Sequence, residues 1–173
     1  MFNSPPCGRF APSPTGSLHA GSLLAALGSW LQARQHGGRW LIRIEDVDTT
    51  REVAGAAQDQ LRTLAAFGLQ HDGEITYQSQ RSGLYQAALD QLLRRGLAFE
   101  CHCSRSALAA VGGIHRRCVA AHPRPDPAIR LRVPDDCEIA FEDGVHGVIH
   151  QRVDLDVGDV VLRRSDGLWA YQL

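Results

Sequence analysis

The 173-residue sequence predicts an α/β fold, in which a parallel sheet is followed by a small, mainly β segment. Three observations support this prediction. Between residues 7 and 99, strand-like runs alternate with segments whose apolar residues recur every three or four positions, as on one face of a helix. Each of these helical segments is followed by a glycine, which can adopt the left-handed conformation that ends a helix. Beyond residue 99, the helical pattern gives way to short β-like runs.

The first region contains four expected strands and three expected helices. The strands are at 7–11, 39–45, 75–77 and 97–101. The helices are at 19–36, 52–67 and 82–95, and they end at Gly37, Gly68 and Gly96. Strand–helix alternation of this kind builds βαβ units and therefore a parallel sheet. We expect residues 1–99 to form half of a Rossmann-like domain.

The segment after Phe99 has a different character. The prolines of HPRPDP at 122–127 disrupt both helices and strands. Short β-like runs follow at 129–133, 138–141, 145–153, 159–164 and 168–173. The dipeptides Asp143-Gly144 and Asp166-Gly167 predict turns between such runs. We expect a small antiparallel insertion here.

The composition is that of an ordinary globular protein, with 44% hydrophobic and 21% charged residues. No apolar run approaches the ~20 residues that a membrane-spanning helix needs. The N-terminus carries no secretion signal, so we expect a cytoplasmic protein. A formal net charge of −1 does not indicate a nucleic-acid-binding protein, and charge alone predicts a solvated surface for the arginines between 116 and 132.

The clearest functional signal is the run at residues 9–22, which reads RFAPSPTGSLHAGS. Phe10 and Ala11 end a buried strand, and two prolines and a glycine then force a turn before the next helix. This arrangement points unpaired backbone N–H groups and the positive end of the helix dipole at a ligand. His19 can donate a hydrogen bond to a phosphate oxygen, and Gly21 lets a flat ring or a phosphate approach the backbone. A histidine that only caps the helix is the alternative.

Three of the five cysteines lie within 18 residues, which suits a metal site in a reducing compartment better than a disulfide framework. Cys101 and Cys103 are followed by His115 and Cys118. Three thiolates and an imidazole satisfy a tetrahedral structural zinc site. Metal binding also supplies folding free energy to a small insertion with few large apolar residues.

Alternatives to this ligand set remain. His102 and His122 are two other candidates for the fourth ligand, and the cysteines could also be reduced and unliganded. Cys7 and Cys137 have no neighbouring cysteine in the sequence, so we expect them to be small buried hydrophobic residues.

The run at 9–22 resembles the first signature of class I aminoacyl-tRNA synthetases of the glutamate-activating branch. There, RFAPSPTG precedes a histidine–glycine pair that stands for the HIGH motif. The run RWLIRIEDVD at 39–48 is similar to the RIED-x-D strand of the same branch. Three further runs resemble a short paralogous family, the glutamyl-queuosine tRNA(Asp) synthetases; they are GSLLAALGS at 21–29, REV with GAA at 51–57, and GGI at 112–114. The resemblance extends from about Arg9 to the last residue.

This resemblance implies an enzyme that uses ATP, with Mg²⁺, to activate L-glutamate and transfers it to the queuosine base in the anticodon of tRNA(Asp). A side-chain carboxylate on the substrate suits an arginine fork, and the resemblance assigns that role to Arg9. It assigns the α-ammonium to Glu45, which also follows a parallel strand, where ligands of open α/β sheets bind. The alternatives are an ion pair of Glu45 with Arg43 or Arg51, and an edge salt bridge for Arg9.

The remaining site residues are carried over from the family in the same way. Those implied for glutamate are Phe10, Ala11, Pro12, Ser13 and Tyr171. Those implied for ATP are Pro12, Thr15, Gly16, His19, Gly21 and Ser22, with His19 and Gly21 as the catalytic pair. For the metal, the paralogous family has a tyrosine where this sequence has His115.

The family also implies a division of the chain. Residues 1–99 would be the first half of the catalytic domain, 100–168 a zinc-containing connective insertion, and 169–173 the start of a return to the sheet. We expect a monomer that is an N-terminal portion of the enzyme, and weak ATP activation without the lysine-bearing KMSKS loop of the second half. The alternatives are a fragment of an ordinary glutamyl-tRNA synthetase, and a non-catalytic, zinc-stabilised RNA-binding module.

Overall fold

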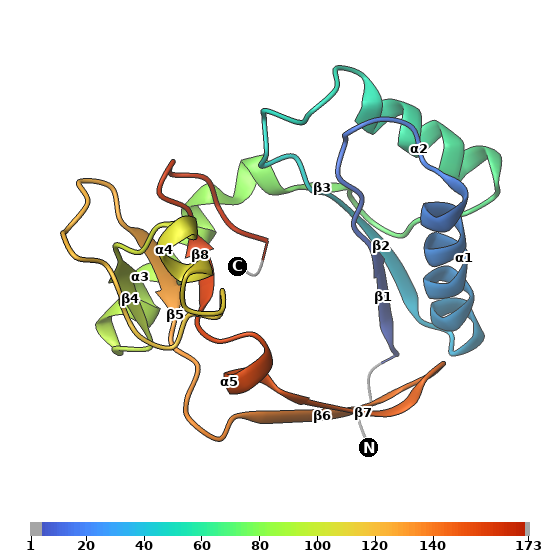
Figure 1. The fold of residues 1–173 in the computed structure, drawn as a ribbon. Helices are drawn as coiled ribbons and strands as arrows, with labels where there is room; N and C mark the ends of the chain where they lie inside the picture. Colours follow the sequence, from blue (N-terminus) through green and yellow to red (C-terminus); the bar gives the residue numbers. More distant parts are fainter. Residues whose placement is uncertain (1–4, 172–173) are drawn as a thin grey trace. The chain divides into compact units, whose positions relative to one another are not determined.

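The structure, a computed structural model, describes residues 5–171. The chain forms two compact units that divide between Ser82 and Gly83 (Figure 1). Each unit has its own sheet and its own buried residues. Among residues 5–171, no helix combines the length and the apolar character needed to cross a membrane.

The first unit is built on a parallel sheet with the strand order β1-β2-β3. Its elements are β1 (Cys7–Phe10), α1 (Ala20–Gln35), β2 (Arg39–Ile44), α2 (Ala56–Ala66), β3 (Thr76–Tyr77) and a 3₁₀ turn (Gln78–Arg81). Each of the two helices connects neighbouring parallel strands, as a βαβ unit requires. The expected parallel sheet is therefore confirmed in this unit.

The core of the first unit follows the alternation of β2. Trp40, Ile42 and Ile44 all point to one side of this strand and are almost fully buried. Ala26 of α1 and Leu64 of α2 belong to the same cluster. In Figure 1, α1 runs beside β1 and β2, and its buried residues Ala26 and Ala33 belong to the core cluster.

The second unit is antiparallel. Its elements are α3 (Ser82–Arg94), β4 (Ala98–Cys101), α4 (Arg105–Ala109), β5 (Ala128–Leu131), β6 (Glu138–Asp143), β7 (Gly147–Arg152), α5 (Val153–Asp156) and β8 (Val160–Arg163). The order β4-β5-β8 forms one sheet, and β6 pairs with β7 in a two-stranded ribbon (Figure 1). The small antiparallel region expected after residue 99 is present.

Three expectations about these elements need correction. The strand expected at 97–101 is not part of the parallel sheet: β4 pairs antiparallel with β5, with Phe99 opposite Arg130. The run at 168–171 forms only one bridge, between Trp169 and Arg163, because the turn at 166–167 brings back too short a segment. Residues 172 and 173 lie outside the described part. The short helices α4 and α5 were not expected, and the division into 1–99, 100–168 and 169–173 stays a prediction.

Candidate nucleotide and metal sites

The segment between β1 and α1 is held by backbone and side-chain groups from later in the chain. The N–H of Glu45 donates to the carbonyl of Pro12 at 2.9 Å, and the N–H of Val53 donates to the carbonyl of Pro14 at 2.9 Å. The amide of Gln60, which is buried in α2, donates to the carbonyl of Ser13 at 3.0 Å and to that of Gly16 at 2.7 Å. The turn is therefore fixed by contacts from three separate segments.

A pocket of about 630 Å³ opens where this turn meets the N-terminus of α1. All six residues predicted for ATP line it: Pro12, Thr15, Gly16, His19, Gly21 and Ser22. Phe10, Ala11 and Ser13, which were predicted for glutamate, also line it. The first turn of α1 contains no acidic side chain, so nothing there neutralises the positive end of the helix dipole.

His19 is the N-cap of α1. Its Nδ1 accepts a hydrogen bond from the backbone N–H of Ser22 at 3.2 Å, and its Nε2 lies 3.1 Å from the Ser22 hydroxyl. The capping function considered from the sequence is therefore present. A Cβ at Gly21 would lie 3.1 Å from Cε1 of His19, so this glycine leaves room for the ring in its capping position.

The three charged or phenolic residues assigned to glutamate do not line this pocket. Glu45 follows β2, is 7% exposed, and accepts a hydrogen bond from Nη2 of Arg43 at 2.7 Å, which confirms one of the two ion pairs considered for it. Arg9 lies on β1, is exposed, and forms no ion pair among residues 5–171. Tyr171 belongs to the second unit and is 77% exposed.

The four residues predicted to bind a metal come together in the second unit. The ligand atoms of Cys101, Cys103, His115 and Cys118 all lie within 4.8 Å of one another. Nε2 of His115 is 3.3 Å from the sulfur of Cys101 and 3.8 Å from that of Cys118. His102 is not in the cluster, and its Nδ1 accepts instead from the backbone N–H of Arg124.

The thiols of this cluster influence one another's protonation. Desolvation acts to raise the pKa of Cys103, but the N–H of Val119, 3.2 Å from its sulfur, and the neighbouring Cys101 outweigh it and lower that pKa below its usual range. Desolvation and the nearby Cys101 and Cys103 raise the pKa of Cys118 to about 11. A divalent cation offsets such repulsion between thiolates, so the donor set fits a metal ion.

None of the five cysteines forms a disulfide. The expectation that Cys7 is buried is wrong, because it begins the short strand β1 and is exposed there. Cys137 is half-buried. Both residues lie outside the metal cluster.

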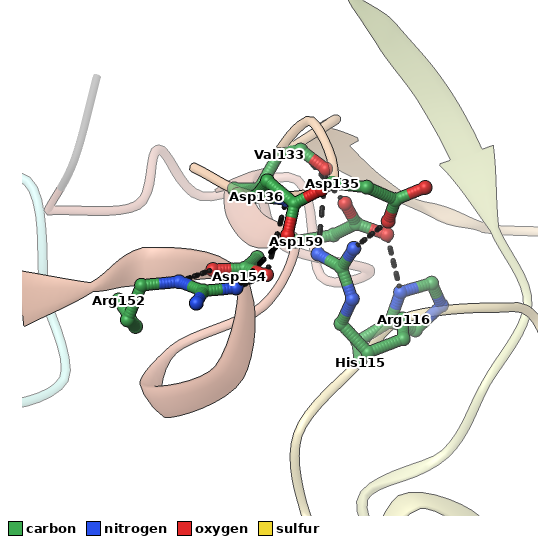
Figure 2. Close-up of polar contacts among 8 residues, drawn as sticks. All are labelled: His115, Arg116, Val133, Asp135, Asp136, Arg152, Asp154 and Asp159. Atoms are coloured by element: carbon green, nitrogen blue, oxygen red, sulfur yellow. Dashed lines mark hydrogen bonds and ion pairs between the residues drawn. The ribbon is translucent and has the colours of Figure 1, made fainter. Parts of the chain in front are cut away.

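Two buried polar residues near these sites were not found from the sequence. Gln60 could have been noticed, since a polar residue between Ala57 and Leu64 interrupts the apolar face of a helix. Asp159 could not, because its contact with His115 joins residues 44 positions apart (Figure 2).

The parallel α/β unit, with its turn into α1, has the fold of a class I aminoacyl-tRNA synthetase catalytic domain. The sequence matches the family described as "tRNA synthetases class I (E and Q), catalytic domain" over residues 7–127. The chain therefore belongs to this family.

Individual proteins similar to this chain include curated relatives and a solved structure. A Xanthomonas campestris protein named "Glutamyl-Q tRNA(Asp) synthetase" is 60% identical over 173 residues, covering all of this chain and 58% of the relative. A protein of the same name from Dechloromonas aromatica is 53% identical, over 99% of this chain and 60% of the relative. The chain thus spans about 58% of the length of these relatives. A solved glutamate tRNA ligase from Elizabethkingia meningosepticum superposes with a TM-score of 0.80 at 27% identity, covering 97% of this chain and 40% of that one.

Proposed function

We propose that this chain forms the nucleotide- and amino-acid-binding part of an enzyme that activates L-glutamate to glutamyl-adenylate and transfers it to the queuosine base of tRNA(Asp). The names of its relatives support a glutamyl group and tRNA(Asp) as the two substrates. The observation that carries the proposal is the gathering of all six residues predicted for ATP around one pocket at the N-terminus of α1.

In this proposal, the phosphates of ATP, with their Mg²⁺, bind at the N-terminus of α1. His19 supplies a directed donor there. Because its Nδ1 accepts the Ser22 N–H, the proton of the neutral ring is on Nε2, which is then free to donate to a phosphate oxygen in place of the Ser22 hydroxyl. A donor aimed at charge that develops in the transition state contributes on the order of 2–4 kcal/mol, or roughly 10²–10³ in rate.

Glutamate would bind through charge on both of its ends. Arg9 is exposed and unpaired within the described chain, so its guanidinium is available to the side-chain carboxylate of the substrate. Glu45 lies at the carboxyl end of β2 and is tied to the turn through its N–H bond to Pro12. Its pairing with Arg43 holds the carboxylate in one orientation, from which it would accept a hydrogen bond from the α-ammonium. For Tyr171, the family resemblance alone supports a role in binding glutamate.

We also assign a structural zinc ion to the second unit. Cys101, Cys103, Cys118 and Nε2 of His115 would hold it in a tetrahedral arrangement. When bound, the ion cross-links β4 to the loop that carries His115 and Cys118. It takes no part in the activation of glutamate.

The nucleotide site is tested by ATP binding to this chain, measured by calorimetry. We expect His19→Ala to weaken binding at least about tenfold, since a hydrogen bond to a charged group is worth roughly 1.5–3 kcal/mol. His19→Ser keeps an N-cap acceptor but is too short to reach the phosphate, and it should weaken binding equally. His36→Ala, at the other end of α1, is the control. Full ATP affinity in His19→Ser would reduce His19 to a capping residue.

The amino-acid site is tested by pyrophosphate exchange. The chain would be joined to the part of the Xanthomonas campestris relative that it does not span. Glutamate should support exchange and glutamine should not, because a neutral amide loses the charge-assisted pairing with Arg9. Arg9→Ala should raise the KM for glutamate far more than the KM for ATP, with the exposed Arg62→Ala as the control. Equal effects on both substrates would remove Arg9 from the amino-acid site.

The acceptor is tested separately with the same joined protein and radiolabelled glutamate. Transfer to tRNA(Asp) that contains queuosine, and not to tRNA(Glu), is the expected result. Transfer to the 3′ end of tRNA(Glu) would instead identify an ordinary glutamyl-tRNA synthetase. Exchange without any transfer would contradict the proposed acceptor.

A further inference from the structure

The side chains of His115 and Asp159 form a buried pair inside the second unit. They are 2% and 3% exposed, and Nδ1 of His115 lies 2.8 Å from Oδ2 of Asp159 (Figure 2). We propose that Asp159 is the positioning residue of the metal site: it determines which ring nitrogen of His115 carries the proton and how the ring is turned. This inference rests on the zinc site proposed above.

The chemistry of the pair determines the tautomer. An ionised carboxylate can only accept hydrogen bonds, so Nδ1 of His115 must donate to Asp159 and carries the proton. In the neutral ring, Nε2 then has a free lone pair. That nitrogen is the one that faces the sulfur of Cys101 at 3.3 Å. A carboxylate bonded to the distal nitrogen also makes a histidine a better metal ligand.

The Asp159 carboxylate is itself fixed on its other side. Its Oδ1 accepts the backbone N–H of Val133 at 2.8 Å, so both oxygens have a partner and the side chain cannot rotate freely. The guanidinium of Arg130 donates to the backbone carbonyl of Asp159 at 2.7 Å. Val133 follows β5 and Arg130 lies within it, so the antiparallel sheet sets the position of the carboxylate.

The backbone of the two residues is also paired. The N–H of Asp159 donates to the carbonyl of His115 at 2.7 Å, next to a β-bridge between His115 and Gly158. A Cβ at Gly158 would lie only 2.4 Å from that carbonyl oxygen, so the close approach requires glycine. The ring of Phe99, with its centroid 5.7 Å from that of His115, contacts the imidazole from β4. Asp159 thus connects a metal ligand to the sheet through both its side chain and its main chain.

A second buried carboxylate in the same unit provides a matched control. Asp154 is 4% exposed, accepts a hydrogen bond from Arg152 at 2.9 Å and one from the backbone N–H of Asp136 at 3.2 Å (Figure 2), and its hydrogen bonds and ion pairs involve none of the four cluster residues. It matches Asp159 in burial and in having a backbone donor. It differs in its partner, which is an arginine and not a metal ligand.

The test is zinc affinity of the purified 173-residue chain, measured by competition with a chromophoric chelator. Asp159→Asn should lower the affinity by about 10- to 100-fold, as loss of such partners does elsewhere. Asp154→Asn should change it less than threefold. Wild-type affinity in Asp159→Asn would overturn the inference while leaving the zinc site intact. A wild-type chain that binds no zinc would overturn the metal site itself, so the two failures are distinguishable.

A double-variant cycle separates positioning of His115 from general loss of folding. In His115→Cys, the fourth ligand is a thiolate that has no distal nitrogen for Asp159 to hold. Adding Asp159→Asn to this variant should therefore not lower zinc affinity further. A 10- to 100-fold loss that persists in the His115→Cys background would show that Asp159 acts through the fold alone, and would refute the proposal.

Discussion

The two units of this chain are stabilised in different ways. The first has one continuous cluster of eight buried apolar residues, with Trp40, Ile42 and Ile44 at its centre. The second has two small clusters of three residues, one of which contains Cys101 and Cys103. Each unit also buries three polar side chains: Glu45, Gln60 and Gln78 in the first, and His115, Asp154 and Asp159 in the second. The units therefore differ in the size of their apolar clusters, and in our proposal a metal ion adds to the stability of the second unit.

This difference matches the chemistry that each unit presents. The turn that lines the proposed nucleotide site belongs to the unit with the larger apolar core. The buried apolar side chains of the second unit are divided between two small clusters, and in our proposal the zinc ion adds a cross-link there. If the apolar core of the first unit and the metal site of the second act independently, a change in one unit should leave the other unaffected.

The largest effect is expected from loss of the metal ligands. Structural zinc contributes on the order of 10 kcal/mol in small domains, so Cys101→Ser should unfold much of the second unit. Hydrogen exchange should rise in β4, β5 and β8 but not in β1 and β2, and zinc content should fall sharply. Cys137→Ser, a half-buried cysteine of the same unit, is the control. Equal exchange changes in both units would show that they fold as one.

The next largest effect is expected from a substitution in the core of the first unit. Trp40 is fully buried, and its indole N–H donates to the Ser29 hydroxyl at 2.9 Å. Trp40→Ala should lower the free energy of unfolding of this unit by about 3–5 kcal/mol, because it leaves a cavity. Zinc content should stay at the wild-type level. Trp30 is half-buried, so Trp30→Ala should lower the free energy of unfolding by less than half as much. Loss of zinc in Trp40→Ala would contradict the independence of the units.

A smaller effect is expected at the turn between β1 and α1. Gln60→Leu removes the donors to the carbonyls of Ser13 and Gly16, but it also removes the amide Oε1, which has no partner within the described chain. The net loss of stability should be about 1–2 kcal/mol. Exchange should rise locally at residues 13–17, and ATP binding should weaken. Gln58→Leu, exposed on the same helix, should do neither.

The smallest effect is a pH dependence in the first unit. The hydrogen bond from Arg34 and the backbone N–H of Trp40 lower the pKa of Asp72. A lowered folded-state pKa gives stability that is present above the unfolded value, near 4, and is lost as the pH falls through the folded value. Asp72→Asn should therefore flatten the stability of this unit between about pH 5 and pH 2. If stability falls with decreasing pH as steeply in Asp72→Asn as in the wild type, the ion pair between Arg34 and Asp72 contributes nothing to stability.

The comparison also separates what the sequence predicts from what it cannot. The parallel strands and the turn into α1 follow from local periodicity and turn residues, and the cluster of Cys101, Cys103, His115 and Cys118 follows from side-chain chemistry. The pairing of β4 does not, because the sequence of a four-residue strand does not specify which strand it pairs with. Asp159 is hidden for the same reason, because its role depends on a contact between distant segments.

The support of the signature turn has a consequence for the order of folding. The turn between β1 and α1 lies near the N-terminus, but the groups that hold it come from Glu45, Val53 and Gln60. These contacts are non-local, and they cannot form before β2 and α2 exist. During synthesis the pocket is therefore completed late, although its own residues emerge among the first. A nascent chain that stops before α2 would carry the full signature motif and still lack the contacts that fix the turn.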